Sequence, residues 1–288
     1  MDMKTYARGL TWGEGPRFHH GALWVSDPQG GTIWTDSTGS WTASPQTSQP
    51  NGLWFLPDGR LTGAIIRERR VGVWDGSGFA EYADLKPVAT GPLGDMVGDA
   101  DGGLYVDDVG FAPHLGEKPR PGRIIYVAPD GTARIAADDV VFPNGLALID
   151  GGRTLVVAET SAQRLVAYDV LGGGRLAGRR VFADLAELVG PEARPDGLCA
   201  APDGVWACTL TGKAVVLVTA DGVRTVIGTD DASPIACCTD GDSRLFVTLA
   251  HSDGRPVMDA VADKTVRTTV EVVDLVPAPP TDPPIETD

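Results

Sequence analysis

The chain has 288 residues, of which 42% are hydrophobic, so it is long enough for one all-β or barrel domain with a large core. Its 24 Lys and Arg residues against 39 Asp and Glu residues give a formal net charge of −15. A field of this sign repels phosphate backbones and anionic lipid, which argues against nucleic-acid and membrane partners and favours a small-molecule substrate.

No segment approaches the roughly 18 apolar residues of a spanning helix, and residues 1–10 contain no apolar stretch behind a basic start. We therefore expect a soluble, cytoplasmic protein. The cysteines show no CxxC spacing and are too few for a disulfide scaffold, so we expect reduced core thiols. They are Cys199, Cys208, Cys237 and Cys238.

A unit recurs along the chain: a polar residue, a small residue, an apolar run, a turn and a second apolar run. The copies are EGPRFHHGALWVSD from Glu14, NGLWFLPDGRLTGAI from Asn51, GDMVGDADGGLYVDD from Gly94, NGLALIDGGRTLVVAET from Asn144, DGLCAAPDGVWACT from Asp196 and a weaker IACCTDGDSRLFVTLA from Ile235. A third alternating strand follows each hairpin, and these strands begin at Thr32, Val71, Arg123, Arg164, Ala214 and Thr269.

Repeats of roughly 40 to 50 residues built from antiparallel strands predict an all-β, six-bladed β-propeller, here over residues 1–275. A β-sandwich gives no reason for this regularity. The last repeat lacks a fourth strand, and we expect Lys4 to Arg8 at the N-terminus to supply it. Residues 276–288 are Pro-rich and acidic, which predicts a disordered tail.

The residue before each first strand should lie at one mouth of the central channel, because first strands line that channel in a propeller. Over the six repeats this position holds Glu14, Asn51, Gly94, Asn144, Asp196 and Ile235, of which two are carboxylates and two are amides. Their hard oxygen donors suit calcium, magnesium or manganese, which predicts a central metal site. Alternatively, the Glu-Gly, Asn-Gly and Asp-Gly pairs merely form turns.

The loops between second and third strands should surround the same mouth. Those at 110–122 and 251–264 are long, and we expect both to overhang the candidate site. Arg67, His114 and His251 are therefore candidate substrate contacts. The chain has no GxSxG elbow, phosphate loop or HExxH helix, so a metal ion and carboxylates would carry any chemistry.

The chain resembles the gluconolactonase/regucalcin family, also called senescence-marker-protein-like propellers, over nearly its whole length. The resemblance rests on EGPRF at Glu14, QPNGLWFLPDGRL around Asn51, FPNGLALIDGGRTLVVAET around Asn144 and RPDGLCAAPDG around Asp196. It implies a six-bladed propeller that acts on lactones of sugar acids. It also implies a calcium, zinc or magnesium ion on Glu14, Asn144 and Asp196, with Asp196 doubling as the base for water.

The third repeat departs from that resemblance. Sugar lactonases of the family begin it with an Arg-x-Asn-Asp run that reaches the substrate hydroxyls, whereas this chain has Pro92, Leu93, Gly94 and Asp95. The gap at Gly94 predicts a larger or less polar substrate, because Phe111 and Trp54 are expected nearby. Asn51 and Asp95 remain as candidate polar contacts.

Three functions follow from these observations. The first is a metal-dependent hydrolase that opens a lactone or related ester, with calcium the expected ion and zinc, magnesium or manganese as alternatives. The second is an isomerase, cyclase or lyase on a less polar metabolite, and the third is a non-catalytic binding propeller with a structural ion. The oligomeric state stays open, since a propeller closes its own sheet edges.

Overall fold

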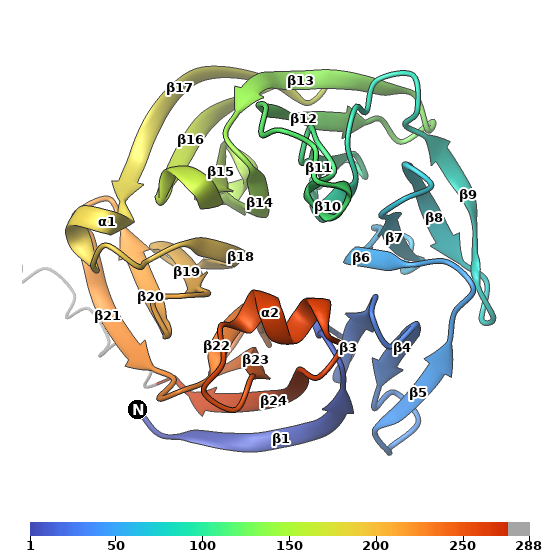
Figure 1. The fold of residues 1–288 in the computed structure, drawn as a ribbon. Coiled ribbons are helices and arrows are strands. Elements are labelled where there is room, and N and C mark those ends of the chain that lie inside the picture. Colours follow the sequence, from blue (N-terminus) through green and yellow to red (C-terminus); the bar gives the residue numbers. More distant parts are fainter. Residues whose placement is uncertain (276–288) are drawn as a thin grey trace, which may run out of the picture.

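The computed structural model describes residues 1–275, which form a ring of six four-stranded antiparallel sheets around a central axis (Figure 1). This confirms the predicted all-β, six-bladed propeller. The predicted tail, 276–288, lies outside the described residues. The helices of residues 1–275 are all too short or too polar to span a lipid bilayer.

Each blade runs outward from a first strand at the axis. Blade 1 is β2 (Glu14–His19), β3 (Ala22–Asp27), β4 (Thr32–Thr35) and β5 (Thr42–Pro45); blade 2 is β6 (Pro50–Phe55), β7 (Leu61–Ile65), β8 (Arg70–Trp74) and β9 (Phe79–Asp84). Blade 3 is β10 (Leu93–Gly98), β11 (Leu104–Asp108), β12 (Gly122–Val127) and β13 (Ala133–Val140); blade 4 is β14 (Pro143–Ile149), β15 (Thr154–Glu159), β16 (Arg164–Leu171) and β17 (Arg175–Asp184). Blade 5 is β18 (Pro195–Ala201), β19 (Gly204–Thr209), β20 (Ala214–Thr219) and β21 (Gly222–Gly228); blade 6 is β22 (Ser233–Thr239), β23 (Arg244–His251), β24 (Arg267–Asp274) and β1 (Met3–Leu10).

Short helices occupy a few of the connections between strands. The 3₁₀ turns are η1 (Pro113–Leu115), η2 (Asp150–Gly152) and η3 (Thr160–Ala162), and the α-helices are α1 (Leu185–Leu188) and α2 (Val257–Ala262). Helix α2 lies within the long 251–264 loop, and in Figure 1 it projects inward over blade 6 toward the axis.

The ring closes through its N-terminus, as predicted. Strand β1 pairs antiparallel with β24, from Met3 opposite Val273 to Leu10 opposite Thr268, and it forms the outer edge of blade 6. Ala7 and Leu10 bury their side chains in this contact. The first and last described strands therefore belong to one sheet.

The core lies between blades rather than within them. One cluster joins blades 4 and 5 through side chains that are at most 2% exposed, among them Val156, Leu165, Leu198 and Val216. An equivalent cluster joins blades 2 and 3. Each four-stranded sheet needs a neighbouring sheet on both faces to bury its apolar side chains. The repeated sheets therefore have to pack into a ring.

A β-bulge interrupts the register of each first strand, within the two or three residues that follow its start. The small residue of the repeat lies at this bulge, where neighbouring first strands converge. A Cβ on Gly52 would be 2.5 Å from the amide nitrogen of Met96, and one on Gly197 would be 2.6 Å from the Cα of Ala236. Glycine is thus required there by close approach of backbones.

Candidate active site

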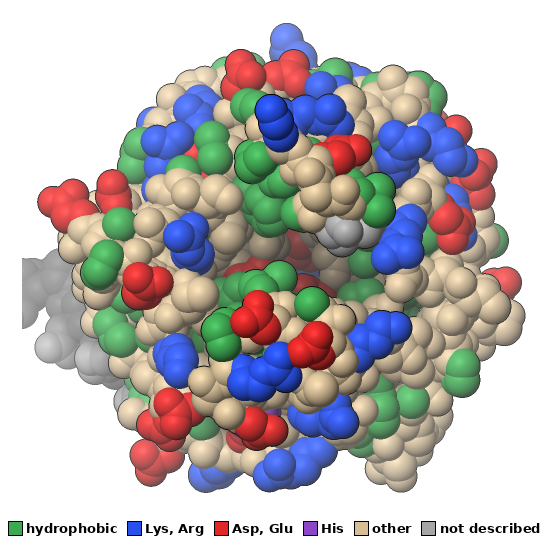
Figure 2. Space-filling view, in the orientation of Figure 1, with side chains coloured by type: hydrophobic (Ala, Val, Ile, Leu, Met, Phe, Trp, Pro, Cys, Tyr) green, Lys and Arg blue, Asp and Glu red, His purple; other side chains and the backbone are tan. Residues whose placement is uncertain are grey.

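A cavity of about 310 Å³ opens where the first strands begin, and we call it the channel-mouth cavity. Figure 2 shows this face, with a central hollow bordered by hydrophobic side chains and acidic atoms at its floor. Its polar lining comes from four blades and from the rim. The polar side chains are those of Glu14, Gln29, Gln49, Asn51, Arg67, Asp107 and Asn144.

Glu14 is oriented by the turn that precedes β2. The Asp27 carboxylate accepts hydrogen bonds from the backbone nitrogens of Thr11 (2.7 Å) and Trp12 (3.0 Å), which fixes that turn. The indole Nε1 of Trp12 then donates to Oε1 of Glu14 at 2.6 Å. The Glu14 carboxylate is therefore oriented by Trp12, two residues earlier in the chain. The turn that carries Trp12 is held in turn by Asp27 at the end of β3.

Blades 3 and 4 use the same device. Asp108, at the end of β11, accepts from the nitrogens of Thr90 and Gly91 at 2.7 Å each, ahead of β10. Glu159, at the end of β15, accepts from the nitrogen of Val141 at 2.8 Å, ahead of β14. These acids at the ends of second strands hold the entry loops of their own blades, which is a structural role.

Asn144 and Asp196 meet at the axis from adjacent blades. Nδ2 of Asn144 donates to Oδ1 of Asp196 at 2.5 Å, and Asp196 is only 4% exposed. Burial raises the pKa of Asp196 to about 7. Burial, and then the charge of Asp196, raises the pKa of Glu14 well above its usual range.

This group of donors suits a divalent cation. No Lys, Arg or His within residues 1–275 pairs with Glu14 or Asp196, whereas the nearby Asp95 has Arg17. The same residues contain no group of three His, Cys, Asp or Glu side chains that could hold an ion without other donors. An ion held by Glu14 and Asp196 would therefore need an uncharged donor, and the amide of Asn144, which is hydrogen-bonded to Asp196, is the candidate.

Asp107 is a site residue that the sequence reasoning missed. Its side chain is fully buried, Oδ2 accepts from the nitrogen of Asp95 at 2.7 Å, and Oδ1 has no hydrogen-bond partner. A Cβ on Gly94 would lie 2.5 Å from that Oδ1. The expected gap at Gly94 is therefore wrong, because a carboxylate from the neighbouring strand fills it. The available signal was a pair of adjacent acids in the otherwise apolar strand LYVDD.

Three expected substrate contacts, and also the expected base Asp196, are not among the residues that line the channel-mouth cavity. Asp95 is 6% exposed and pairs with Arg17 at 3.1 Å, because the bulge after Gly94 turns its side chain along the channel. Phe111 is buried against Phe142, with ring centroids 5.7 Å apart. His251 is 3.0 Å from Oγ1 of Thr269 and borders a separate pocket beside the N-terminus.

The two long loops differ in their relation to the cavity. The 110–122 loop contributes Pro113 to the lining, as expected of an overhanging loop, while the side chain of His114 lies outside the described part of the structure. The 251–264 loop contributes no lining residue. Its helix α2 instead packs Val257 and Ala260 in a cluster with Trp12 and Ile235, which supports the wall of the channel mouth.

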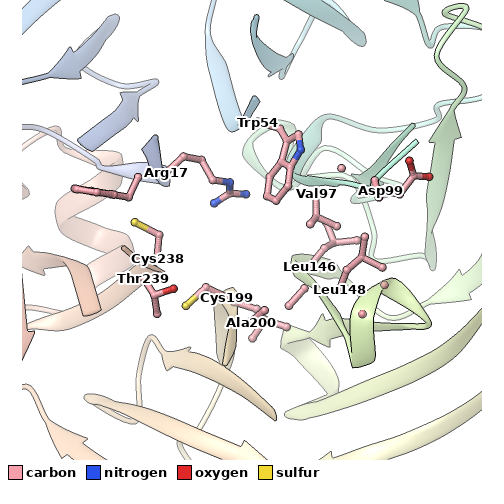
Figure 3. A pocket seen from close by; sticks show the side chains of 17 residues that line it. Arg17, Trp54, Val97, Asp99, Leu146, Leu148, Cys199, Ala200, Cys238 and Thr239 are labelled. Carbon is pink, nitrogen blue, oxygen red and sulfur yellow. The ribbon is translucent and has the colours of Figure 1, made fainter. Parts of the chain in front are cut away.

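A second cavity, of about 400 Å³, lies where the first strands end (Figure 3). Its labelled side chains include Arg17, Trp54, Cys199 and Cys238, and the Arg17 guanidinium lies 5.2 Å from the Trp54 ring centroid. Trp54 therefore lines this cavity and not the channel mouth. Arg17 borders this cavity and Asp95 follows Gly94, so their ion pair lies between the two cavities.

The cysteines lie among the first and second strands of blades 5 and 6. The four are free, as expected, and three of them are buried. The sulfur atoms of Cys199 and Cys237 are 3.4 Å apart, and burial raises the pKa of the Cys238 thiol. They contribute no charge to the channel.

Comparison with known proteins identifies relatives of this propeller. The family model described as "SMP-30/Gluconolactonase/LRE-like region" matches residues 12–251. A luciferin-regenerating enzyme has a TM-score of 0.77 at 18% identity, covering 95% of each chain. A calcium-binding regucalcin from Agrobacterium tumefaciens has a TM-score of 0.75 at 19% identity, covering 94% of each chain. A gluconolactonase from Xanthomonas campestris has a TM-score of 0.73 at 21% identity, and the match covers 94% of this chain and 89% of that chain.

A curated relative matches only part of the chain. Adipocyte plasma membrane-associated protein Hemomucin of Drosophila melanogaster is 31% identical over 109 residues, which are 38% of this chain and 17% of that protein. The matched region is thus less than a fifth of hemomucin. At the identities of the solved structures, the likeness to them establishes the fold.

Proposed function

The chain belongs to the SMP-30/gluconolactonase/LRE-like family, and from this membership we propose that it is a metal-dependent hydrolase that opens a lactone or related ester at the channel-mouth cavity. One observation carries the proposal. Glu14 of blade 1 and Asp196 of blade 5 are close enough for the charge of Asp196 to raise the pKa of Glu14, Asp196 is hydrogen-bonded to the amide of Asn144, and within residues 1–275 no cationic side chain pairs with either carboxyl group. Carboxylate and amide oxygens are hard donors of the kind that calcium and magnesium bind.

Calcium is the proposed ion, because all the donors are oxygens and because the similar regucalcin is described as calcium-binding. When bound, such an ion supplies a Lewis acid that polarises a carbonyl oxygen and lowers the pKa of water. Glu14, Asn144 and Asp196 are the residues that would hold it.

Asp196 is the proposed general base. Burial raises its pKa to about 7, close to the pH at which a base must both accept and release a proton. The hydrogen bond from Asn144 fixes its carboxylate, and the 4% exposure of Asp196 keeps bulk water from competing for it. Asp196 would take the proton of the water that attacks the substrate carbonyl.

The remaining lining would position the substrate. Leu93 and Phe142 supply an apolar wall to the cavity, and Asn51 offers an amide at its polar side. Arg67 is exposed at the rim, where its guanidinium can meet the carboxylate that lactone opening produces. The cavity volume of about 310 Å³ suits a small lactone ring.

Chelation tests this proposal. We expect the purified protein to hydrolyse at least one member of a panel of γ-butyrolactone, δ-valerolactone and glucono-δ-lactone, followed as acid release in a pH-stat. EDTA should reduce the rate at least tenfold, and calcium in excess of EDTA should restore it, because the carbonyl loses its Lewis acid.

Equal rates with and without EDTA would contradict metal dependence. If no lactone is turned over while the protein holds an ion, the hydrolase proposal is wrong. Isomerase, cyclase or lyase chemistry on the same scaffold would then replace it.

A further inference from the structure

Asp107 occupies a position that the other blades fill with small, uncharged side chains. In blade 3 the position lies opposite the bulge of the first strand, one residue before the end of the second strand. The register places Ala64, Ala158 and Cys208 there in blades 2, 4 and 5. In blade 1 the residue before the end of β3 is Ser26, which pairs with Glu14, and in blade 6 Thr248 pairs with Ala236 three residues before the end of β23. Asp107 is the one acidic residue among them, and burial raises its pKa well above the usual range of a carboxyl group.

The fold uses one oxygen of this carboxylate. Oγ of Ser26 donates to the carbonyl of Glu14 at 2.9 Å, and Oγ1 of Thr248 accepts from the nitrogen of Ala236 at 3.0 Å, so a hydroxyl suffices at the bulge. Oδ2 of Asp107, like Oγ1 of Thr248, accepts a hydrogen bond from a backbone nitrogen, that of Asp95, at 2.7 Å. Oδ1 is thus not needed for the bulge, yet it is buried without a partner, which is costly unless a ligand meets it.

The surroundings of Oδ1 call for a positively charged donor. Asp107 shares the channel-mouth lining with Glu14, and the basic side chain of that lining, Arg67, is exposed and forms no ion pair with Asp107.

We propose that Asp107 is a specificity-determining residue whose Oδ1 accepts a hydrogen bond from an ammonium group of the substrate, so that the cavity prefers lactones bearing an amino group beside the carbonyl. The inference rests on the proposed lactone hydrolysis. It also replaces the expectation of a less polar substrate, because the carboxylate of Asp107 stands where the gap was expected.

The test compares α-amino-γ-butyrolactone with γ-butyrolactone and α-hydroxy-γ-butyrolactone. In the wild type kcat/KM should be highest for the amino-lactone, and Asp107→Asn should reduce the amino-to-unsubstituted ratio about 10- to 100-fold, as expected for a hydrogen bond to a charged group. Asp107→Ser should do the same while keeping a hydroxyl for the nitrogen of Asp95. Asp203→Asn, which alters an exposed carboxylate, is the matched control and should keep the wild-type ratio.

A binding measurement separates this inference from the proposed function. Calorimetry with the stable lactam 3-amino-2-pyrrolidinone should show tighter binding than with 2-pyrrolidinone, and Asp107→Asn should abolish the difference, whether or not any lactone is hydrolysed. Equal affinity for the two lactams, or a preference for the hydroxy-lactone, would overturn the inference. So would a tenfold loss of calcium affinity in Asp107→Asn, since the carboxylate would then serve the ion.

Discussion

Replacing Asp196 with asparagine is expected to reduce lactone turnover by a factor of about 10³ or more. The substitution preserves the size of the side chain but removes the proposed base, and it also removes one of the two carboxylates that hold the ion. Because a carboxylate that is 4% exposed is exchanged for a neutral amide, the metal-free variant should melt no lower than the wild type. Turnover in a pH-stat and thermal melting in EDTA are the two measurements.

The control for this prediction is again Asp203→Asn, which should retain full turnover. A variant Asp196→Asn that keeps activity within tenfold of the wild type would exclude Asp196 as the base. If, in the presence of calcium, the variant melts lower and yet keeps its ligand affinity, the ion is structural and the protein is a binding propeller.

Calcium is expected to stabilise the protein far more at pH 8 than at pH 5. The pKa of Asp196 is about 7 and that of Glu14 is also raised, whereas carboxyl groups in unfolded chains titrate near about 4. Between about pH 4 and 7 the metal-free folded state therefore binds more protons than the unfolded state, so its free energy of unfolding falls as the pH rises through this window.

The ion competes with those protons, so its stabilisation grows over the same range. With free calcium at roughly a thousand times Kd, the gain at pH 8 should be about 4 kcal/mol, or about 10 °C in Tm. Melting curves in EDTA and in calcium at both pH values give the comparison. A calcium-induced shift in Tm that is equal at the two pH values would contradict protonation of the ion-binding carboxylates.

The ring of first-strand residues could be predicted from the sequence because it depends on the repeat alone. Glu14, Asn144 and Asp196 each precede a small residue and an apolar run, and close approach of first strands at the axis explains that spacing. The closing strand was predictable for the same reason, since the sixth repeat lacked a fourth strand and the N-terminal segment was available to complete its sheet.

The substrate side of the cavity was less predictable, because it depends on where single side chains turn. The bulge at Gly94 sends Asp95 to Arg17 and lets Asp107 take the vacant place, and a one-residue change of register decides both. His251 lies at the end of β23, where the sequence predicts it, yet its side chain hydrogen bonds with Thr269 of β24 and does not enter the cavity. Strand order fixes which loops gather at the mouth, but not which side chains enter it.

The number of calcium ions bound per chain, measured by calorimetry on protein first stripped with a chelator, tests the central claim most directly. We predict one ion for the wild type, and binding at least a hundredfold weaker in each of the variants Glu14→Gln, Asn144→Ala and Asp196→Asn. Absence of stoichiometric calcium, magnesium, manganese or zinc binding in the wild type, or wild-type affinity in all three variants, would contradict a metal centre on these residues.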